Sequence, residues 1–241
     1  MPQQKQRLDK IIGNSGFGTR KEIKTWVRKG LVTVNGVTAT SSDMKVDPET
    51  DAITVMGEQL EYQQYIYLMM HKPAGYITAT EDKRQPTVYD LLPEFYQQFD
   101  LSPVGRLDKD TEGLLLLTND GANVHKWLAP KSHVEKTYFA KLEKPIKPSD
   151  FQAIEQGVNI GGYVTLPAQL KAGEQPNEIF LTIHEGKFHQ VKRMFEALDN
   201  KVLYLKRVSM GGVPLDETLE KGEVRELTEA ELAKLLGEEE S

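Results

Sequence analysis

Hydrophobic residues near the start of the chain recur at the three- and four-residue spacing of amphipathic helices. This spacing predicts two short helices separated by a glycine-rich turn over residues 13–18. Thr19 and Glu22 form a capping box that predicts the start of the second helix, and Gly30 stands where a helix end favours a left-handed residue. The apolar positions are Leu8, Ile11 and Ile12 in the first helix and Ile23, Trp26 and Val27 in the second.

The pattern then changes from helical spacing to strand-like runs. Residues 31–37 predict a strand that enters a turn at Asn35-Gly36, and Asn-Gly is the strongest short-range signal for a β-hairpin. A hydrophilic stretch at 58–64 follows. We therefore expect a small domain over residues 1–60, a linker over 61–64 and a larger domain over 65–241.

The larger domain is predicted to contain mostly strands with a few helices. Because long helices do not separate the strands at regular intervals, the predicted fold class is α+β, with a largely antiparallel mixed β-sheet and flanking helices. Thr228 and Glu231 form a second capping box. The predicted strands are 65–70, 114–118, 136–142, 178–183 and 201–208, and the predicted helices are 124–128, 151–156, 190–198 and 229–236.

Composition restricts the class of protein. Of the 241 residues, 39% are hydrophobic and 27% are charged, which is enough apolar material for a core and unlike the composition of disordered chains. The absence of cysteine excludes disulfides and thiolate chemistry and favours a reducing compartment. Residues 1–10 are polar and no apolar run is long enough to span a bilayer, so we expect a cytoplasmic protein with no membrane partner.

The net charge of −6 conceals a segregation of charge along the chain. Residues 5–30 contain eight basic and two acidic side chains, whereas residues 216–241 contain ten acidic and three basic ones. A second basic stretch lies at 187–207. Because cations bind phosphates, the two basic stretches are candidate nucleic-acid surfaces, with solvated helix faces as the alternative.

The densest group of unusual residues is the charged loop 105–113, which leads into the apolar strand at 114–118. Loops fixed by a buried strand commonly carry catalytic groups. Asp108 and Asp110 could act as the acid and base of a glycosidase, but two residues so close in one loop have no assured mutual geometry. A surface loop with solvated charges is equally consistent with the spacing.

Four motifs resemble those of the pseudouridine synthases of the RsuA/RluB/E/F family. Residues 105–114, GRLDKDTEGL, resemble the signature G-R-L-D-x-D-T-x-G-L. Residues 67–76 resemble the opening strand and N-K-P-x-G-Y turn, with His71 in place of the usual asparagine, while residues 135–138 and 185–195 resemble the E-K-x-Y strand and the third motif. Residues 1–60 resemble the S4-like RNA-binding domain that commonly precedes this catalytic domain.

The resemblance implies an isomerase that cuts the N1–C1′ bond of a uridine in RNA, turns the uracil and rejoins it through C5, without a cofactor or a metal. It implies Asp108 as the catalytic carboxylate, which acts as a nucleophile or as a general base. It implies Tyr138 as the aromatic face that holds the flipped uracil. Lys192 is implied as the cation beside Asp108, with Arg193 as the alternative cation. The residues expected to bind RNA are Arg106, Lys187, His189, Gln190 and Arg193, together with Arg20, Lys21, Lys24 and Arg28.

The implied substrate is ribosomal RNA. Residues 135–138 and 165–170 look more like the RsuA branch, which modifies 16S (small-subunit) RNA, than the large-subunit branches. The expected partner is ribosomal RNA or a small-subunit assembly intermediate, and the protein is expected to be a monomer. Two alternatives are a noncatalytic RNA-binding or ribosome-assembly factor, suggested by the basic N-terminal stretch, and a large-subunit synthase.

Overall fold

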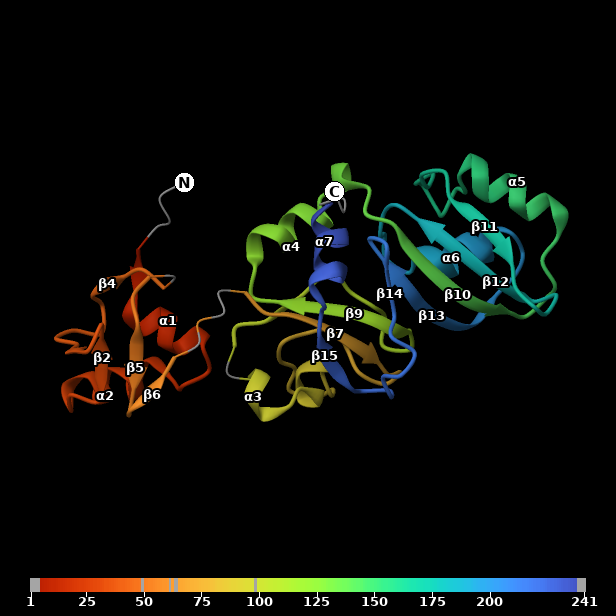
Figure 1. Ribbon diagram of the computed structural model, residues 1–241. Helices are drawn as coiled ribbons and strands as arrows, with labels where there is room; N and C mark the ends of the chain where they lie inside the picture. Colours follow the sequence, from red (N-terminus) through yellow and green to blue (C-terminus); the bar gives the residue numbers. More distant parts are fainter. Residues whose placement is uncertain (1–4, 49, 61, 63–64, 98, 238–241) are drawn as a thin grey trace. The chain divides into compact units, whose positions relative to one another are not determined.

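The computed structural model describes residues 5–48, 50–60, 62, 65–97 and 99–237. Over these residues the chain forms two compact units, one within residues 5–66 and 92–101 and the other within residues 67–91 and 102–237 (Figure 1). Residues 61, 63 and 64 of the predicted linker lie outside the described residues, as does the acidic end of the chain at 238–241.

The N-terminal unit combines two helices with short antiparallel strands. Helix α1 (Leu8–Asn14) packs on α2 (Arg20–Arg28), which begins at the predicted capping box between Thr19 and Glu22. Asn35 and Gly36 have φ angles of 52° and 76°, as a two-residue hairpin turn requires. Strand β1 (Gln6–Arg7) pairs with β4 (Lys45–Val46), and β3 (Val37–Thr38), β2 (Val32–Val34), β5 (Ile53–Val55) and β6 (Glu58–Gln59) form a sheet in that order.

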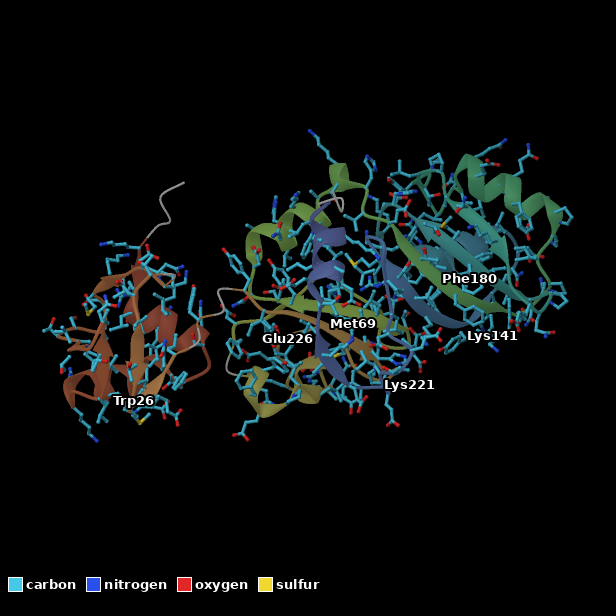
Figure 2. All side chains as sticks on the ribbon, in the orientation of Figure 1. Trp26, Met69, Lys141, Phe180, Lys221 and Glu226 are labelled. Carbon is cyan, nitrogen blue, oxygen red and sulfur yellow. The ribbon has the colours of Figure 1, made fainter. Side chains whose placement is uncertain are left out.

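The predicted apolar face of each helix is buried in the core of this unit, and Trp26 packs against that core (Figure 2). Because one face of α2 is buried, its basic side chains lie in solvent. The buried helix positions are Leu8, Ile11, Ile12, Ile23 and Val27. The exposed cations of α2 are Arg20, Lys21, Lys24 and Arg28.

The larger unit is built on a nine-stranded mixed sheet. Its order is β11-β12-β10-β13-β9-β7-β15, with β14 beside β13 and β8 beside β9. The pair β9–β13 is parallel and the other described pairs are antiparallel, which confirms the predicted α+β fold on a largely antiparallel sheet. The strands are β7 (Tyr67–Lys72), β8 (Ser102–Pro103), β9 (Glu112–Thr118), β10 (Lys136–Leu142), β11 (Gln169–Ala172), β12 (Glu178–Ile183), β13 (Val202–Met210), β14 (Val213–Pro214) and β15 (Val224–Glu226).

Helices pack on both halves of this sheet (Figure 1). Helix α4 (Gly121–Leu128) contacts β8, α7 (Glu229–Leu236) contacts β14, α5 (Pro148–Gln156) contacts β11, and α6 (Gln190–Ala197) contacts β13. The predicted capping box of α7 is present, and the Asp120 carboxylate caps α4 by accepting a hydrogen bond from the backbone N of Asn123 at 3.1 Å. The short helix α3 spans Glu94–Gln97. Over the described ranges, no helix is both long enough and apolar enough to cross a membrane.

The parallel pair β9–β13 sets the position of the charged loop 105–111. Gly113 of β9 stands opposite Arg207 of β13, with φ at 105°, and a Cβ at this position would overlap the backbone N, C and O atoms of Arg207. Tyr138 of β10 also pairs with Arg207 from the other side of β13. Gly113, Arg207 and Tyr138 therefore form one row across three neighbouring strands. This row places the end of the charged loop close to Tyr138.

Candidate active site

The backbone of loop 105–111 is held by a fully buried lysine. Lys72, at the end of β7, has no exposed surface, and its Nζ donates hydrogen bonds to the carbonyl oxygens of Thr111 at 2.8 Å and Asp108 at 3.1 Å. Burial lowers the pKa of Lys72 to about 8, although the nearby carboxylates of Asp110, Asp108 and Glu112 act in the opposite direction. Lys72 thus ties the loop backbone to strand β7.

Two further contacts restrain the loop on either side of Asp108. Thr78 Oγ1 donates to the carbonyl oxygen of Leu107 at 2.9 Å and accepts from the Leu107 backbone N at 3.2 Å. The backbone N of Gly75 donates to the carbonyl oxygen of Lys109 at 2.7 Å. The carboxylate of Asp108 is therefore presented by a backbone that is fixed at several points.

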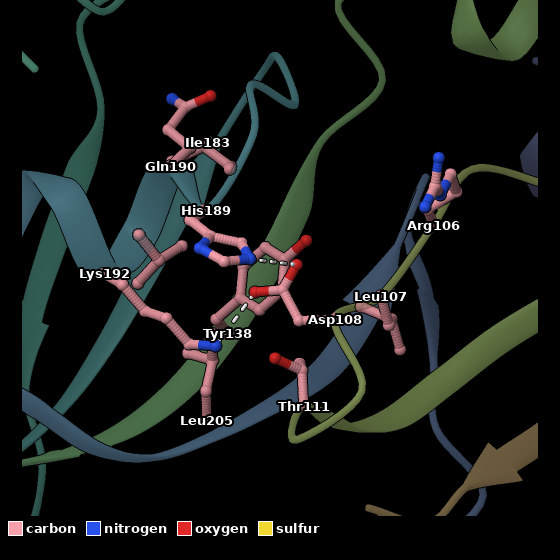
Figure 3. A pocket seen from close by; sticks show the side chains of 11 residues that line it. Arg106, Leu107, Asp108, Thr111, Tyr138, Ile183, His189, Gln190, Lys192 and Leu205 are labelled. Atoms are coloured by element: carbon pink, nitrogen blue, oxygen red, sulfur yellow. Dashed lines mark hydrogen bonds and ion pairs between the residues drawn. The ribbon is translucent and has the colours of Figure 1, made fainter. Parts of the chain in front are cut away.

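The Asp108 carboxylate lies at the centre of an ion-pair cluster (Figure 3). Its Oδ2 accepts a hydrogen bond from Lys192 Nζ at 3.0 Å, and its Oδ1 lies 3.5 Å from His189 Nε2. Lys192 Nζ also donates to Asp110 Oδ1 at 2.6 Å. Burial acts to lower the pKa of Lys192, but the bonds to Asp110 and Asp108 outweigh burial and raise it, so the ammonium is charged at neutral pH.

These groups line a pocket that remains open to solvent. The Asp108 side chain keeps 27% of its surface exposed, so the carboxylate can meet a substrate. Tyr138 is buried in the pocket wall, and the Thr111 hydroxyl, also buried, has no hydrogen-bond partner among the described residues. The apolar lining consists of Leu107, Ile183, Val191 and Leu205. A carboxylate beside an aromatic ring and apolar walls can act as a nucleophile or a base on a planar polar ring.

The three residues predicted to be catalytic, Asp108, Tyr138 and Lys192, lie together in this pocket. The alternative cation, Arg193, has different partners. Its guanidinium donates to the carbonyl oxygen of Phe188 at 3.4 Å and to that of Ile160. The geometry therefore favours Lys192 over Arg193 as the partner of Asp108.

The predicted RNA contacts occupy several places. His189 lies in the pocket, whereas Arg106 lines it with a guanidinium that points away from Asp108 (Figure 3). Gln190 is only 4% exposed, and its amide accepts from the backbone N of Lys187 at 2.8 Å and donates to Glu185 at 3.0 Å, so this side chain shapes the turn before α6. The four predicted cations of the N-terminal unit are those exposed on α2.

No role was predicted for Lys72 or Thr111, although both lie within the motifs at 67–76 and 105–114 described above. Lysine is almost never fully buried without partners, and the carbonyl groups that satisfy Lys72 come from a loop about forty residues later in the chain. The sequence signal for Lys72 was its place in the motif at 67–76, between an apolar strand and the Pro73-Ala74-Gly75 turn. Over the described part of the chain, no group of three or more histidine, aspartate or glutamate side chains could hold a metal ion.

Comparisons with known proteins find two matching family models and several similar proteins. The family model described as RNA pseudouridylate synthase matches residues 66–197, and the S4 domain model matches residues 6–51. The uncharacterized RNA pseudouridine synthase YtzG of Bacillus subtilis is 53% identical over 94% of this chain and 96% of that protein. Ribosomal small subunit pseudouridine synthase A of Vibrio cholerae is 44% identical over 95% of this chain and 99% of that protein. A crystal structure of a pseudouridylate synthase has 39% identity and a TM-score of 0.67, covering 95% of this chain and 99% of that one.

Proposed function

The chain belongs to the RNA pseudouridylate synthase family and is therefore an RNA-modifying isomerase. From this premise we propose that it acts on one uridine of small-subunit ribosomal RNA, with Asp108 as its catalytic carboxylate. The choice of substrate rests on relatives named ribosomal small subunit pseudouridine synthase A, which are 40–44% identical over nearly the whole chain. The S4 domain supplies a second RNA-binding unit.

The observation that carries the catalytic assignment is the ion pair between Asp108 and Lys192 inside the pocket. The ammonium of Lys192 lies 3.0 Å from the carboxylate and holds it in the pocket, where it can attack a nucleotide or take a proton. Tyr138 in the same pocket provides an aromatic face for the uracil. A uracil stacked in RNA cannot reach Asp108, so the target nucleotide must leave the stack and enter the pocket.

The reaction needs no change in oxidation state. The N1–C1′ bond of uridine breaks, a C5–C1′ bond forms, the proton on C5 leaves to solvent, and N1 takes up a proton. Asp108 serves either as a nucleophile toward the nucleotide or as a base at C2′. In both routes the carboxylate must start ionised, and the loop held by Lys72 and Thr78 must present it at a fixed place.

Tritium release from RNA labelled at C5 of uridine tests this function. We expect the purified protein to release tritium from a small-subunit ribosomal RNA transcript or its assembly intermediate, and to leave a large-subunit transcript unchanged. Mapping of the pseudouridine should then give one position. Release from the large-subunit transcript alone would contradict the proposed substrate, and no release from any ribosomal RNA or subunit intermediate would contradict the proposed reaction.

The pairing of Asp108 predicts unequal effects for two adjacent cations. We expect Lys192→Met to lower the turnover number about a hundredfold, because the acid loses the charge that holds it in place, while RNA affinity changes only slightly. Arg193→Met should cost about tenfold or less, because that guanidinium bonds two carbonyl groups outside the ion-pair cluster. Single-turnover rates at saturating protein separate the two effects, and a larger loss in Arg193→Met would refute the assignment of Lys192.

The exposed cations of α2 predict a salt-dependent contribution to RNA affinity. Replacing Arg20, Lys21, Lys24 and Arg28 together by glutamine should weaken binding of the ribosomal RNA transcript and reduce the slope of log affinity against log salt concentration by up to about 3, because fewer counterions are released. The rate of a single turnover at saturating protein should stay near that of the wild type. Titrations at several salt concentrations measure the slope, and an unchanged slope would show that α2 does not contact phosphates.

A further inference from the structure

A large aromatic side chain stands in solvent next to the candidate active site. Phe188 is 75% exposed, the highest value for any large hydrophobic residue among those the structure describes. It directly precedes His189, which lines the pocket. A single exposed apolar residue is ordinary by itself, so its meaning depends on how the ring is held and what surrounds it.

The turn that carries Phe188 is fixed by a buried side chain. The Gln190 amide accepts a hydrogen bond from the backbone N of Lys187 at 2.8 Å, and the backbone N of Gln190 donates to the carbonyl oxygen of Lys187 at 3.0 Å. His189 adopts a left-handed backbone with φ at 50° at the start of α6. The ring of Phe188 is therefore presented by a well-braced turn.

Phe188 stacks on a residue that contacts the Asp108 carboxylate. Its ring lies on the imidazole of His189 with centroids 3.8 Å apart and planes 18° from parallel. The edge of the same imidazole reaches the acid, because His189 Nε2 lies 3.5 Å from Asp108 Oδ1. One face of Phe188 is thus covered by His189, and most of the ring remains open within two side chains of the reacting group.

A basic residue directly precedes the ring. Lys187 Nζ lies 4.4 Å from the ring centroid of Tyr163, whereas the ammonium of Lys192 is held by Asp108 and Asp110. Cations for phosphates, combined with aromatic faces on which bases stack, are the features by which proteins hold single-stranded nucleic acid. An apolar peptide carries no phosphates, so a cation beside the ring would not contribute to binding it.

We propose that Phe188 stacks on the nucleobase adjacent to the target uridine. This inference rests on the proposed function, because a uridine that leaves its stack to reach Asp108 also exposes a face of its neighbour. Phe188 supplies a replacement for that lost contact at the mouth of the pocket. Any of the four bases offers such a face, so the contact adds affinity with little sequence preference.

A coupling experiment between the protein ring and the RNA base tests this inference. The probes are two fluorescein-labelled single-stranded RNAs of equal length, each with one central uridine. The first has adenosines on both sides of the uridine, and the second has abasic riboses there. Both carry the same phosphates, so a difference in their affinities reports on the flanking bases. Fluorescence anisotropy at one fixed salt concentration gives the two dissociation constants.

The wild type should prefer the RNA with flanking bases by about 5- to 150-fold, the range expected for one stacked base. Phe188→Ala should reduce this preference to about twofold, and Phe188→Trp should retain it. Phe180→Ala, at a residue labelled in Figure 2, is the matched control. Phe180 of β12 pairs with Phe139 of β10 and therefore lies on the sheet face opposite to Tyr138. This control should keep the wild-type preference.

The outcomes separate this inference from the proposed function. A wild type that does not discriminate between the two RNAs, or a Phe188→Ala variant that discriminates as well as the wild type, would overturn the stacking role even when tritium is released from ribosomal RNA. Loss of discrimination in Phe188→Ala but not in Phe180→Ala would support it. If the same protein released no tritium from ribosomal RNA, the proposed function would fail and the stacking inference would stand.

Discussion

Replacing Asp108 by asparagine should lower pseudouridine formation by at least about a thousandfold while leaving RNA affinity nearly unchanged. An amide is neither a nucleophile nor a base of useful strength, whichever route the reaction takes. The shape of the site should survive, because the amide oxygen can still accept the hydrogen bond that Lys192 now donates to Oδ2 at 3.0 Å. Tritium release from the ribosomal RNA substrate measures the loss.

Asp110 offers the matched control for this prediction. It lies in the same loop and binds the same ammonium at 2.6 Å, but its side chain is 72% exposed. We expect Asp110→Asn to slow the reaction by about tenfold at most, because Lys192 keeps its bond to Asp108. An Asp108→Asn variant that retained turnover within tenfold of the wild type, or lost no more than Asp110→Asn, would show that the catalytic carboxylate lies elsewhere.

Gly113→Ala should destabilise the larger unit by about 4 kcal/mol or more, or prevent it from folding. The φ angle of 105° is unfavourable for any residue with a Cβ, and the added atom would overlap the backbone of Arg207 on the paired strand. The strands β9 and β13 would have to separate. Because β9 follows directly after the loop that carries Asp108, activity should fall together with stability.

Urea unfolding followed by tryptophan fluorescence measures this effect. The chain has two tryptophans, and a Trp26→Phe background leaves the buried Trp127 of the larger unit as the only reporter. Gly121→Ala is the control, because a Cβ there meets no atom within 4 Å and the residue lies in the first turn of α4. This variant should be as stable as the parent or slightly more so. A Gly113→Ala protein within about 1 kcal/mol of the parent would contradict the prediction.

Local sequence patterns were sufficient for the longer elements. The predicted bounds of the strands at 136–142 and 178–183 and of the helix at 229–236 coincide with β10, β12 and α7. Their alternating or helical hydrophobic spacing is set by one buried face, so a short window contains the whole signal. The capping boxes at Thr19 and Thr228 are equally local and equally well predicted.

Elements defined by their neighbours were not predictable in this way. The strands β11, β14 and β15 are two to four residues long, and β11 and β15 contain charged side chains. They become strands because longer strands supply their hydrogen-bond partners. The parallel pairing of β9 with β13 likewise joins residues 112–113 to 206–207, and no pattern within either segment specifies that contact.

The same distinction applies to the site. Asp108 and Lys192 are 84 residues apart, and their pairing was expected only because the motifs resemble those of a known family. The buried Lys72 needed the folded structure, since its partners are carbonyl groups that any loop possesses. The exposure of Phe188 and its stack on His189 also depend on a turn whose shape is set by a buried glutamine.

The parallel pairing of β9 with β13 separates the proposed catalytic groups into two segments of the chain. Asp108 lies in the loop just before β9. Tyr138 and Lys192 lie in β10 and α6, which come later in the chain and pack next to β13. A polypeptide cleaved between α4 and β10 would yield two fragments, neither holding both the acid and its counter-cation. Catalytic turnover in a mixture of such fragments would therefore report their reassociation, and during synthesis turnover could begin only after the last of these strands has docked.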